Sequence, residues 1–380
     1  MRHLMRVLHV YRTFFPDSQG GGEEAIRQIA HGVSEFGWRP HVFCLSPSPV
    51  PRRMRLSGLM VHREWSMASP ASCDLASLPG LVRFQRLARR FDLIHFHFPW
   101  PLADVLAELL PKGLPYVVTY HSDIVRQQRA LAVYRPLMKR FLGRAARVVA
   151  TSPNYRASSP VLRDYVPNAA VIPLGLEEER YPAVEPERVA QWRRRLGEGF
   201  FLFVGVLRYY KGLEFLVEAA RLSGLPVVVV GQGPLAVALQ NQGQGIQNLH
   251  FLGYVEDADK VALYQLAAAV CFPSHLRSEA FGVTLLEGAM YAKPLISAEI
   301  GTGTSFVNIH GETGLVVPPA DPGSLAQAMT TLARDPALRN RLGAGARSRF
   351  QRLFTARQVG EQYASLYNEV VGRIVAPRGL

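Results

Sequence analysis

The sequence predicts an α/β protein with two domains, each built on a parallel sheet. In the first half, short apolar runs alternate with helical patterns, which is typical of βαβ units. A new buried strand at residues 200–206 (FFLFVGV) opens a second half of the same style. With 380 residues, the chain has room for two or three domains that bury sizeable cores. We expect a first domain over residues 1–176, a linker over 177–198, a second domain over 199–349 and a C-terminal segment over 350–380.

Composition narrows the classes of partner. The formal net charge of +13 fits a nucleic acid, an anionic membrane surface or a phosphate-bearing substrate. No aromatic-interleaved RNA motif, zinc spacing or helix-turn-helix pattern is present, so we expect no nucleic acid. The three cysteines, Cys44, Cys73 and Cys271, are odd in number and far apart, which fits a reducing compartment. Neither a secretory segment nor a membrane span is predicted, so we expect a cytoplasmic protein.

The first domain begins with a strand at residues 5–10 and a loop that leads into an amphipathic helix. Gly21 and Gly22, preceded by Gly20, would let the backbone approach a ligand at the helix N-terminus. A flexible turn explains the glycines equally well, since the spacing is not G-x-G-x-x-G. Residues 46–82 are rich in Pro, Ser and Arg, and we expect a surface excursion there. Further strands are expected at residues 41–45, 92–98, 115–121, 148–152 and 171–175.

Three histidines stand near the expected ends of strands. His95 and His97 alternate on the strand over 92–98, which could suggest a metal site. Because we predict no third ligand nearby, a hydrogen-bonded or rim-facing pair is the favoured interpretation. His121 ends the next strand, and residues at the carboxyl ends of parallel strands face the ligand crevice. A capping or core role for His121 remains open at this point.

A basic amphipathic helix is expected over residues 126–147. Apolar residues alternate there with seven cations: Arg126, Arg129, Arg135, Lys139, Arg140, Arg144 and Arg147. Such a helix suits an anionic membrane surface or a phosphorylated acceptor. A solvated face of arginines is an equally good interpretation of the pattern.

In the second domain, two cations follow the first strand. Arg208 and Lys211 lie in the loop between that strand and the next helix, where they are well placed to bind a pyrophosphate. Gly231 and Gly233 form the turn after the strand over 227–230. Further on, residues 257–259 (DAD) resemble a metal-binding motif, but they precede a helical pattern. Acidic residues are favoured in the first turn of a helix, so we expect no metal there.

The most informative stretch covers residues 273–294 (PSHLRSEAFGVTLLEGAMYAKP). Glu279 ends a polar loop, and Glu287 lies eight residues later inside an expected helix over 283–292. Only i+3 and i+4 positions meet on a helix, so these carboxylates are not neighbours on one face. They can instead contact two ends of an extended ligand that lies across the helix N-terminus, which favours phosphate. A sugar nucleotide has this layout of hydroxyls and pyrophosphate.

This stretch resembles the E-x7-E motif of family 4 glycosyltransferases, which are retaining enzymes of the GT-B fold. The segments over 205–212 (GVLRYYKG) and 231–234 (GQGP) resemble two further motifs of that family. The resemblance implies two Rossmann-like domains that face a central cleft, with a C-terminal helix that crosses back to the first domain. It assigns catalytic roles to Glu279, His121, Arg208 and Lys211, and donor binding to Gly21, Gly22, Gly205, Gly231, Gly233, Phe281, Gly282, Val283, Thr284 and Glu287.

In detail, the resemblance implies that Glu279 contacts the donor sugar and Glu287 the ribose. Residues 301–322 look similar to bacterial mannosyl- and rhamnosyltransferases of O-chain assembly, which favours a GDP-sugar and a lipid-linked saccharide acceptor. We expect no cofactor, and no metal because cations are expected at the diphosphate. We also expect peripheral contact with the inner face of the cytoplasmic membrane. The alternatives are a UDP-sugar enzyme of this family, a GT-B epimerase or phosphorylase, and a non-catalytic sugar-nucleotide binder.

Overall fold

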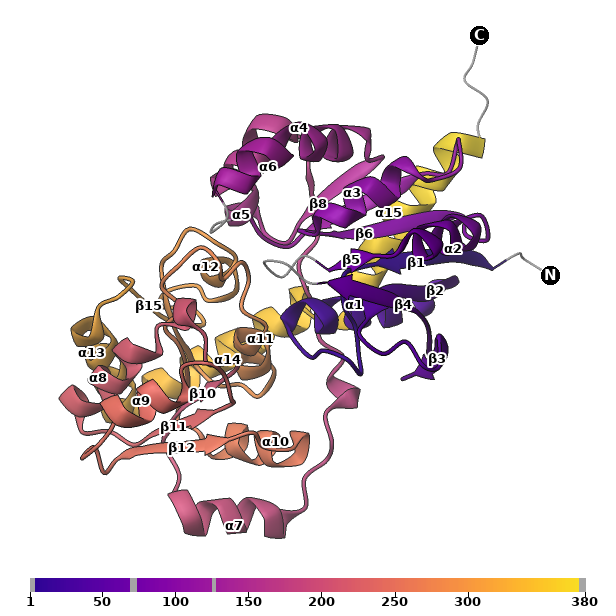
Figure 1. The fold of residues 1–380 in the computed structure, drawn as a ribbon. Helices are drawn as coiled ribbons and strands as arrows, with labels where there is room; N and C mark the ends of the chain where they lie inside the picture. Colours follow the sequence, from indigo (N-terminus) through magenta and orange to yellow (C-terminus); the bar gives the residue numbers. More distant parts are fainter. Residues whose placement is uncertain (1–3, 69–73, 125–127, 376–380) are drawn as a thin grey trace. The chain divides into compact units, whose positions relative to one another are not determined.

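The computed structural model describes residues 4–68, 74–124 and 128–375, and it divides the chain into two compact units (Figure 1). The first unit comprises Met1–Gly175 with Ala356–Leu380, and the second comprises Leu176–Thr355. The segment expected to be a linker belongs to the second unit. Its helix α7 (Pro186–Leu196) packs on α10 (Asp257–Leu266), because Arg188 and Trp192 both donate hydrogen bonds to Asp259 at 2.9 Å.

The first unit is built on one sheet, in which the strands lie in the order β3-β4-β2-β1-β6-β7-β8-β9 and β5 pairs with β4. Its strands are β1 (Met5–Val10), β2 (Trp38–Ser46), β3 (Arg53–Leu56), β4 (Leu59–Ala68), β5 (Leu75–Ala76), β6 (Leu93–Phe98), β7 (Tyr116–Tyr120), β8 (Arg147–Ala150) and β9 (Ala170–Val171). Only β3 and β5 run antiparallel to their partner among the described strands. The chain order reverses between β1 and β6, and in open α/β sheets ligands bind at the carboxyl ends of strands at such a point.

The expected surface excursion over residues 46–82 is wrong for the described residues, while residues 69–73 of that range lie outside them. The structure forms β3, β4, β5 and the start of α2 (Leu78–Ala88) there, and β4 extends the parallel sheet beside β2. The apolar pattern of β4 is broken by Arg63, which is buried and forms an ion pair with Asp17 at 2.7 Å. Because this buried charge interrupts the apolar alternation and its partner lies 46 residues away, the sequence pattern alone does not indicate the strand.

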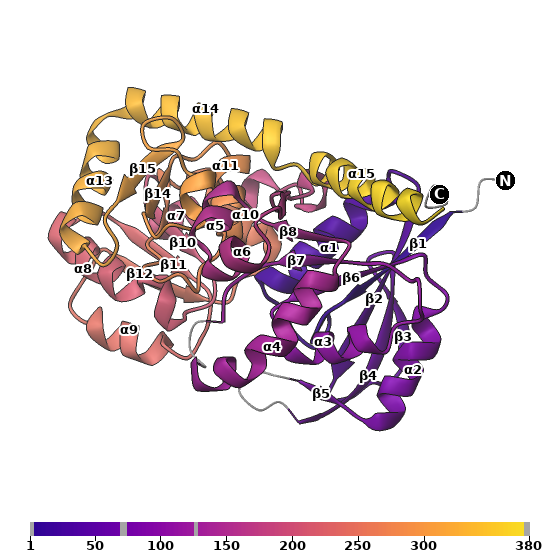
Figure 2. The same ribbon diagram turned by 90° about the horizontal axis from the view of Figure 1, so that it is seen from above.

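Helices cover the sheet of the first unit: α1 (Gly21–Ser34), α2, α3 (Pro101–Glu108), α4 (Gln128–Arg144), α5 (Pro153–Ser158), α6 (Pro160–Tyr165) and α15 (Ala356–Val375). The last of these packs against α1 (Figure 2). Their backbones approach closely, since a Cβ on Gly360 would lie 2.3 Å from the carbonyl carbon of Gly32. The expected crossover of the C-terminal segment is thereby confirmed, but it begins at Ala356 rather than at residue 350. Residues 376–380 of that prediction lie outside the described part of the chain.

The second unit has a sheet of parallel strands in the order β12-β11-β10-β13-β14-β15. They are β10 (Phe201–Val204), β11 (Val227–Val230), β12 (Leu249–Gly253), β13 (Ala269–Phe272), β14 (Leu295–Ala298) and β15 (Gly314–Val317). The helices are α7, α8 (Leu213–Ser223), α9 (Ala236–Gln242), α10, α11 (Val283–Met290), α12 (Thr304–Val307), α13 (Pro322–Arg334) and α14 (Pro336–Leu353). This is the Rossmann order, and its reversal between β10 and β13 marks the expected ligand position.

Candidate functional site

Three loops of the second unit meet at the point where its strand order reverses. They follow β10, β11 and β13, and backbone hydrogen bonds join them. The amide of Leu207 donates to the carbonyl of Gln232 at 2.9 Å, and that of His275 donates to Tyr210 at 3.0 Å. The predicted residues that follow β10, β11 and β13 therefore lie on one connected group of loops.

The glycines of these loops allow close backbone packing. Gly205 and Gly231 have φ angles of 151° and 131°, which side-chain-bearing residues rarely adopt. A Cβ on Gly231 would lie 1.9 Å from the carbonyl oxygen of Gly205, and one on Gly233 would lie 2.5 Å from that of Leu207. Packing between loops thus already requires glycine at these predicted donor-binding positions.

Lys211 and Glu279 form a close ion pair across two of the loops. The Nζ atom of Lys211 lies 2.5 Å from a carboxylate oxygen of Glu279, and the two side chains are only 12% and 11% exposed. The Ser274 hydroxyl lies 3.4 Å from the same oxygen. The structure thus brings together the predicted sugar-binding carboxylate and a predicted diphosphate-binding cation. Arg208, the second predicted cation, is exposed and begins the 3₁₀ turn that contains Lys211.

Helix α11 begins at the same place. Gly282 precedes it with a φ of 90°, and no side chain caps its first N–H groups. Thr284 anchors the first turn, because its hydroxyl donates to the carbonyl of Val204 at the end of β10, at 3.0 Å. Phe281 is buried beside the turn. The partial positive charge of this N-terminus adds to that of the nearby cations, so the site favours an anion.

Glu287 is held by three donors that sequence reasoning did not identify. The hydroxyls of Tyr181 and Tyr264 both lie 2.8 Å from its carboxylate oxygens, and the Lys260 ammonium lies 3.0 Å away. Burial alone would lower the pKa of Lys260, but the charges of Glu287 and Asp257 outweigh it and raise that pKa. Asp257 lies in the first turn of α10, as expected, and Glu287 is buried among these three donors.

Replacing Glu287 should therefore affect folding as well as binding. We expect Glu287→Ala to lower the free energy of unfolding by about 3–5 kcal/mol, because it leaves the buried Tyr264 hydroxyl without its acceptor and Lys260 with only the exposed Asp257 as an ionic partner. Glu287→Gln keeps the shape and an acceptor oxygen, and should cost less. Thermal melting of both variants checks this, and equal melting temperatures for Ala and wild type would contradict it.

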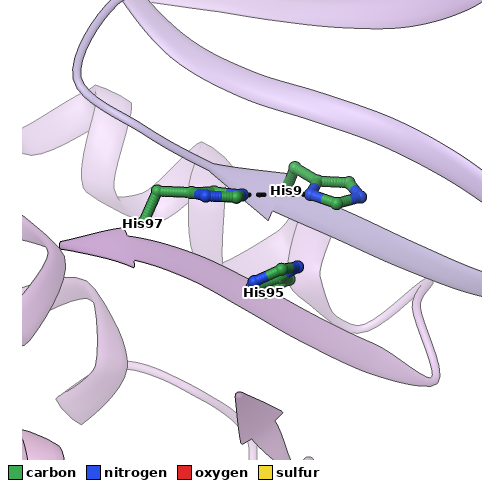
Figure 3. A group of neighbouring side chains, drawn as sticks. All are labelled: His9, His95 and His97. Atoms are coloured by element: carbon green, nitrogen blue, oxygen red, sulfur yellow. Dashed lines mark hydrogen bonds between the residues drawn. The ribbon is translucent and has the colours of Figure 1, made fainter. Parts of the chain in front are cut away.

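In the first unit, His121 continues a row of buried histidines. Its Nε2 lies 2.9 Å from Nδ1 of His97. Nε2 of His97 in turn lies 3.1 Å from Nδ1 of His9, a contact that Figure 3 shows. Burial lowers the pKa of His121 to about 4 and that of His9 to about 3. The pKa of His97 also falls well below its usual value, chiefly because of burial. All three rings are therefore neutral at neutral pH.

The expectation that no third residue would lie near His95 and His97 is wrong. His9 on β1 stands beside them, because it pairs in register with His95, and ligand atoms of the three lie within 4.8 Å of one another. Such proximity could suit a metal ion. However, both nitrogens of His95 already make hydrogen bonds, to the hydroxyls of Tyr367 at 2.6 Å and Thr119 at 2.7 Å. The cluster is thus arranged as a hydrogen-bond network within the first unit.

The glycine-rich loop of the first unit is ordered by a residue that sequence reasoning missed. Helix α1 begins at Gly21, and Glu23 in its first turn accepts hydrogen bonds from Thr13 at 2.9 Å and Ser18 at 2.5 Å. A Cβ on Gly22 would lie 3.1 Å from the hydroxyl of Tyr11. Gly21 and Gly22 therefore lie in the first turn of a helix whose start is fixed by hydrogen bonds. They belong to the same unit as His121, while the other predicted site residues lie in the second unit.

Part of the basic helix is engaged in ion pairs. Arg140 and Arg144 on α4 both bind Glu108, at 2.9 and 2.7 Å, and Arg147 binds Glu369. Arg135 and Lys139 are exposed. Arg126 lies outside the described residues, and so does the side chain of Arg129. Within the described ranges, no helix combines the length and apolarity that crossing a bilayer demands.

Comparisons with known proteins agree across the whole chain. Residues 19–180 match the family described as Glycosyltransferase Family 4, and residues 184–349 match the one described as Glycosyl transferases group 1. The D-rhamnosyltransferase WbpZ of Pseudomonas aeruginosa is 50% identical over 354 residues, which cover 93% of each chain. The O-antigen chain mannosyltransferase C of Escherichia coli is 45% identical over 97% of this chain and 99% of its own.

Solved structures agree on the fold. The sucrose-phosphate synthase of Thermosynechococcus elongatus superposes with a TM-score of 0.78 at 22% identity, over 97% of this chain and 100% of that one. Anabaena HepE in complex with UDP gives a TM-score of 0.76 at 20% identity, over 96% and 100%. At such identities the likeness concerns the fold alone, and it confirms the expected GT-B fold with its two Rossmann-like units.

Proposed function

Because the chain belongs to the family 4 glycosyltransferases, also described as group 1, we propose that it moves a mannosyl or rhamnosyl group from a GDP-sugar to a lipid-linked saccharide. The relatives that support this sugar choice are a D-rhamnosyltransferase and an O-antigen chain mannosyltransferase, both at 45% identity or more. The product would be a bacterial cell-surface polysaccharide. The observation that carries the proposal is the Lys211–Glu279 pair at the start of α11.

The chemistry of this proposal rests on charge. As the sugar becomes oxocarbenium-like, negative charge gathers on the departing diphosphate. Lys211 and the N–H groups of α11 would oppose that charge, with exposed Arg208 in the same loop as Lys211, and one such contact is worth about 3 kcal/mol. Glu279 would hold hydroxyls of the donor sugar, and Glu287 the ribose. With cations at the diphosphate, we propose that the reaction needs no divalent metal and no cofactor, and that it retains the anomeric configuration.

A thermal-shift screen with GDP, UDP, ADP and TDP tests the choice of donor. A ligand that binds only the folded state stabilises it by about 2.7 kcal/mol at 100 times its Kd, so the matching nucleotide should raise Tm far more than the others. We expect GDP to give the largest shift. A larger shift with UDP would replace the GDP-sugar by the UDP-sugar alternative, and no shift with any nucleotide would contradict the donor site.

We further propose that α4 contacts the inner face of the cytoplasmic membrane. Exposed Arg135 and Lys139 accompany Val133, which is 85% exposed, and this combination suits an anionic lipid surface. The protein should sediment with vesicles that contain anionic lipid at low salt, and Arg135→Glu with Lys139→Glu should abolish this. Arg193→Glu with Arg194→Glu on α7 makes the same charge change as a control. Equal binding to neutral and anionic vesicles would count against the proposal.

A further inference from the structure

His121, His97 and His9 form one continuous chain of hydrogen bonds. His9 lies on β1 and His97 on β6, while His121 follows β7, so three neighbouring strands of the first unit supply the rings (Figure 3 shows the two inner ones). His9 and His97 are fully buried, whereas His121 is partly exposed. The row thus leads from the partly exposed His121, just after β7, into the buried interior of the sheet.

A neutral imidazole has one N–H donor and one lone pair, which limits the chain to two arrangements. In the inward arrangement, Nε2 of His121 donates to His97, and Nε2 of His97 donates to His9. In the outward arrangement, Nδ1 of His9 donates to His97, and Nδ1 of His97 donates to Nε2 of His121. His97 uses both ring nitrogens in either case, so its tautomer and that of His121 are linked.

The buried end of the chain decides between the two arrangements. Nε2 of His9 is buried and has no hydrogen-bond partner among the described residues. The inward arrangement would leave an N–H donor at this atom, whereas the outward one leaves a lone pair. Buried N–H groups without an acceptor are the rarer defect, so the outward arrangement is favoured.

We propose that His97, supported by His9, holds His121 with its proton on Nδ1, so that His121 presents an N–H donor to its ligand. His97 is then a positioning residue that acts through His121. The proposal rests on the proposed function for the identity of that ligand, an oxygen of the sugar diphosphate. A donor at Nδ1 can stabilise such an oxygen but cannot remove a proton from the acceptor, and this excludes His121 as the general base of the transfer.

Nitrogen-15 NMR of histidine-labelled protein measures the tautomers directly, without any substrate. The signals of His121 are assigned by their loss in His121→Asn. We expect the protonated, pyrrole-type shift at Nδ1 and the pyridine-type shift at Nε2 of His121, and the same pattern for His97. A protonated Nε2 on His121 would overturn the proposal.

Two matched variants test the role of His97. His97→Asn places an amide nitrogen near the position of Nδ1, where it can still donate to His121, whereas His97→Gln places its amide near Nε2 and loses that contact. We expect His97→Asn to keep the tautomer of His121. We expect His97→Gln to lose that tautomer and to reduce kcat at least tenfold, with KM unchanged. If both variants kept the tautomer of His121, the proposal would be contradicted. If wild-type protein showed the expected tautomers but transferred no sugar, the proposed function would be refuted instead.

Discussion

Replacing Lys211 by alanine is expected to reduce kcat about 10²–10³-fold, the largest loss from any single cation of this site. The Nζ atom lies 2.5 Å from the carboxylate of Glu279, in the loop that leads into α11, where we propose that the diphosphate carries its growing charge. Arg208 and the helix N-terminus would remain, so some activity should persist. Steady-state kinetics with the donor identified by thermal shift measures the effect.

The control for Lys211→Ala is Arg221→Ala on α8. Arg221 is an exposed cation of the same unit and forms an ion pair with Glu218. Exposed ion pairs contribute only about 0–1 kcal/mol to the free energy of unfolding, so the variant should stay folded. This variant should keep kcat within about twofold of wild type, since it removes charge without touching the site. A Lys211→Ala enzyme as active as this control would contradict the role given to Lys211.

Replacing Glu279 by glutamine should also lower kcat strongly, by about 10²-fold, for a different reason. A carboxylate that accepts from sugar hydroxyls is worth roughly 1.5–3 kcal/mol per hydrogen bond, and an amide retains only part of this. The diphosphate contacts stay in place, because Lys211 keeps its charge and glutamine still offers it an uncharged acceptor oxygen. We therefore expect nucleotide binding to persist while turnover falls.

Glutamine is the appropriate substitution here because Glu279→Ala would leave Lys211 in a site that is 12% exposed, without a partner. A loss of folding would then be hard to separate from a loss of chemistry. Glu279→Gln should melt within a few degrees of wild type, and its kcat should fall regardless. Unchanged kcat in this variant would remove Glu279 from the sugar-binding site.

The parts of the molecule that follow from local sequence were predictable. Apolar runs gave the strands of the second unit, and the loop positions of Lys211 and Glu279 followed from the ends of β10 and β13. Parallel strands in a Rossmann order bring such ends together, so two residues separated by 68 positions could be expected at one site.

The parts that depend on distant pairing were not predictable. Arg63 breaks the pattern of β4, and its partners from distant parts of the chain, the Asp17 carboxylate and the Ser46 hydroxyl, explain why a charge is tolerated there. His9 joins His95 through strand register, which one sequence does not reveal. One sequence also does not reveal the hydrogen bond between Tyr181 and Glu287, which are 106 residues apart. This bond connects the expected linker to the second unit, to which the linker belongs.

The central claim is that a nucleoside diphosphate binds where Lys211 meets the start of α11, and isothermal titration with GDP tests it most directly. Wild type and Glu279→Gln should bind GDP with Kd values within about threefold of each other. Lys211→Ala should bind at least tenfold more weakly, which corresponds to about 1.4 kcal/mol. If Lys211→Ala bound GDP as tightly as wild type, the diphosphate would lie elsewhere and the account would be wrong.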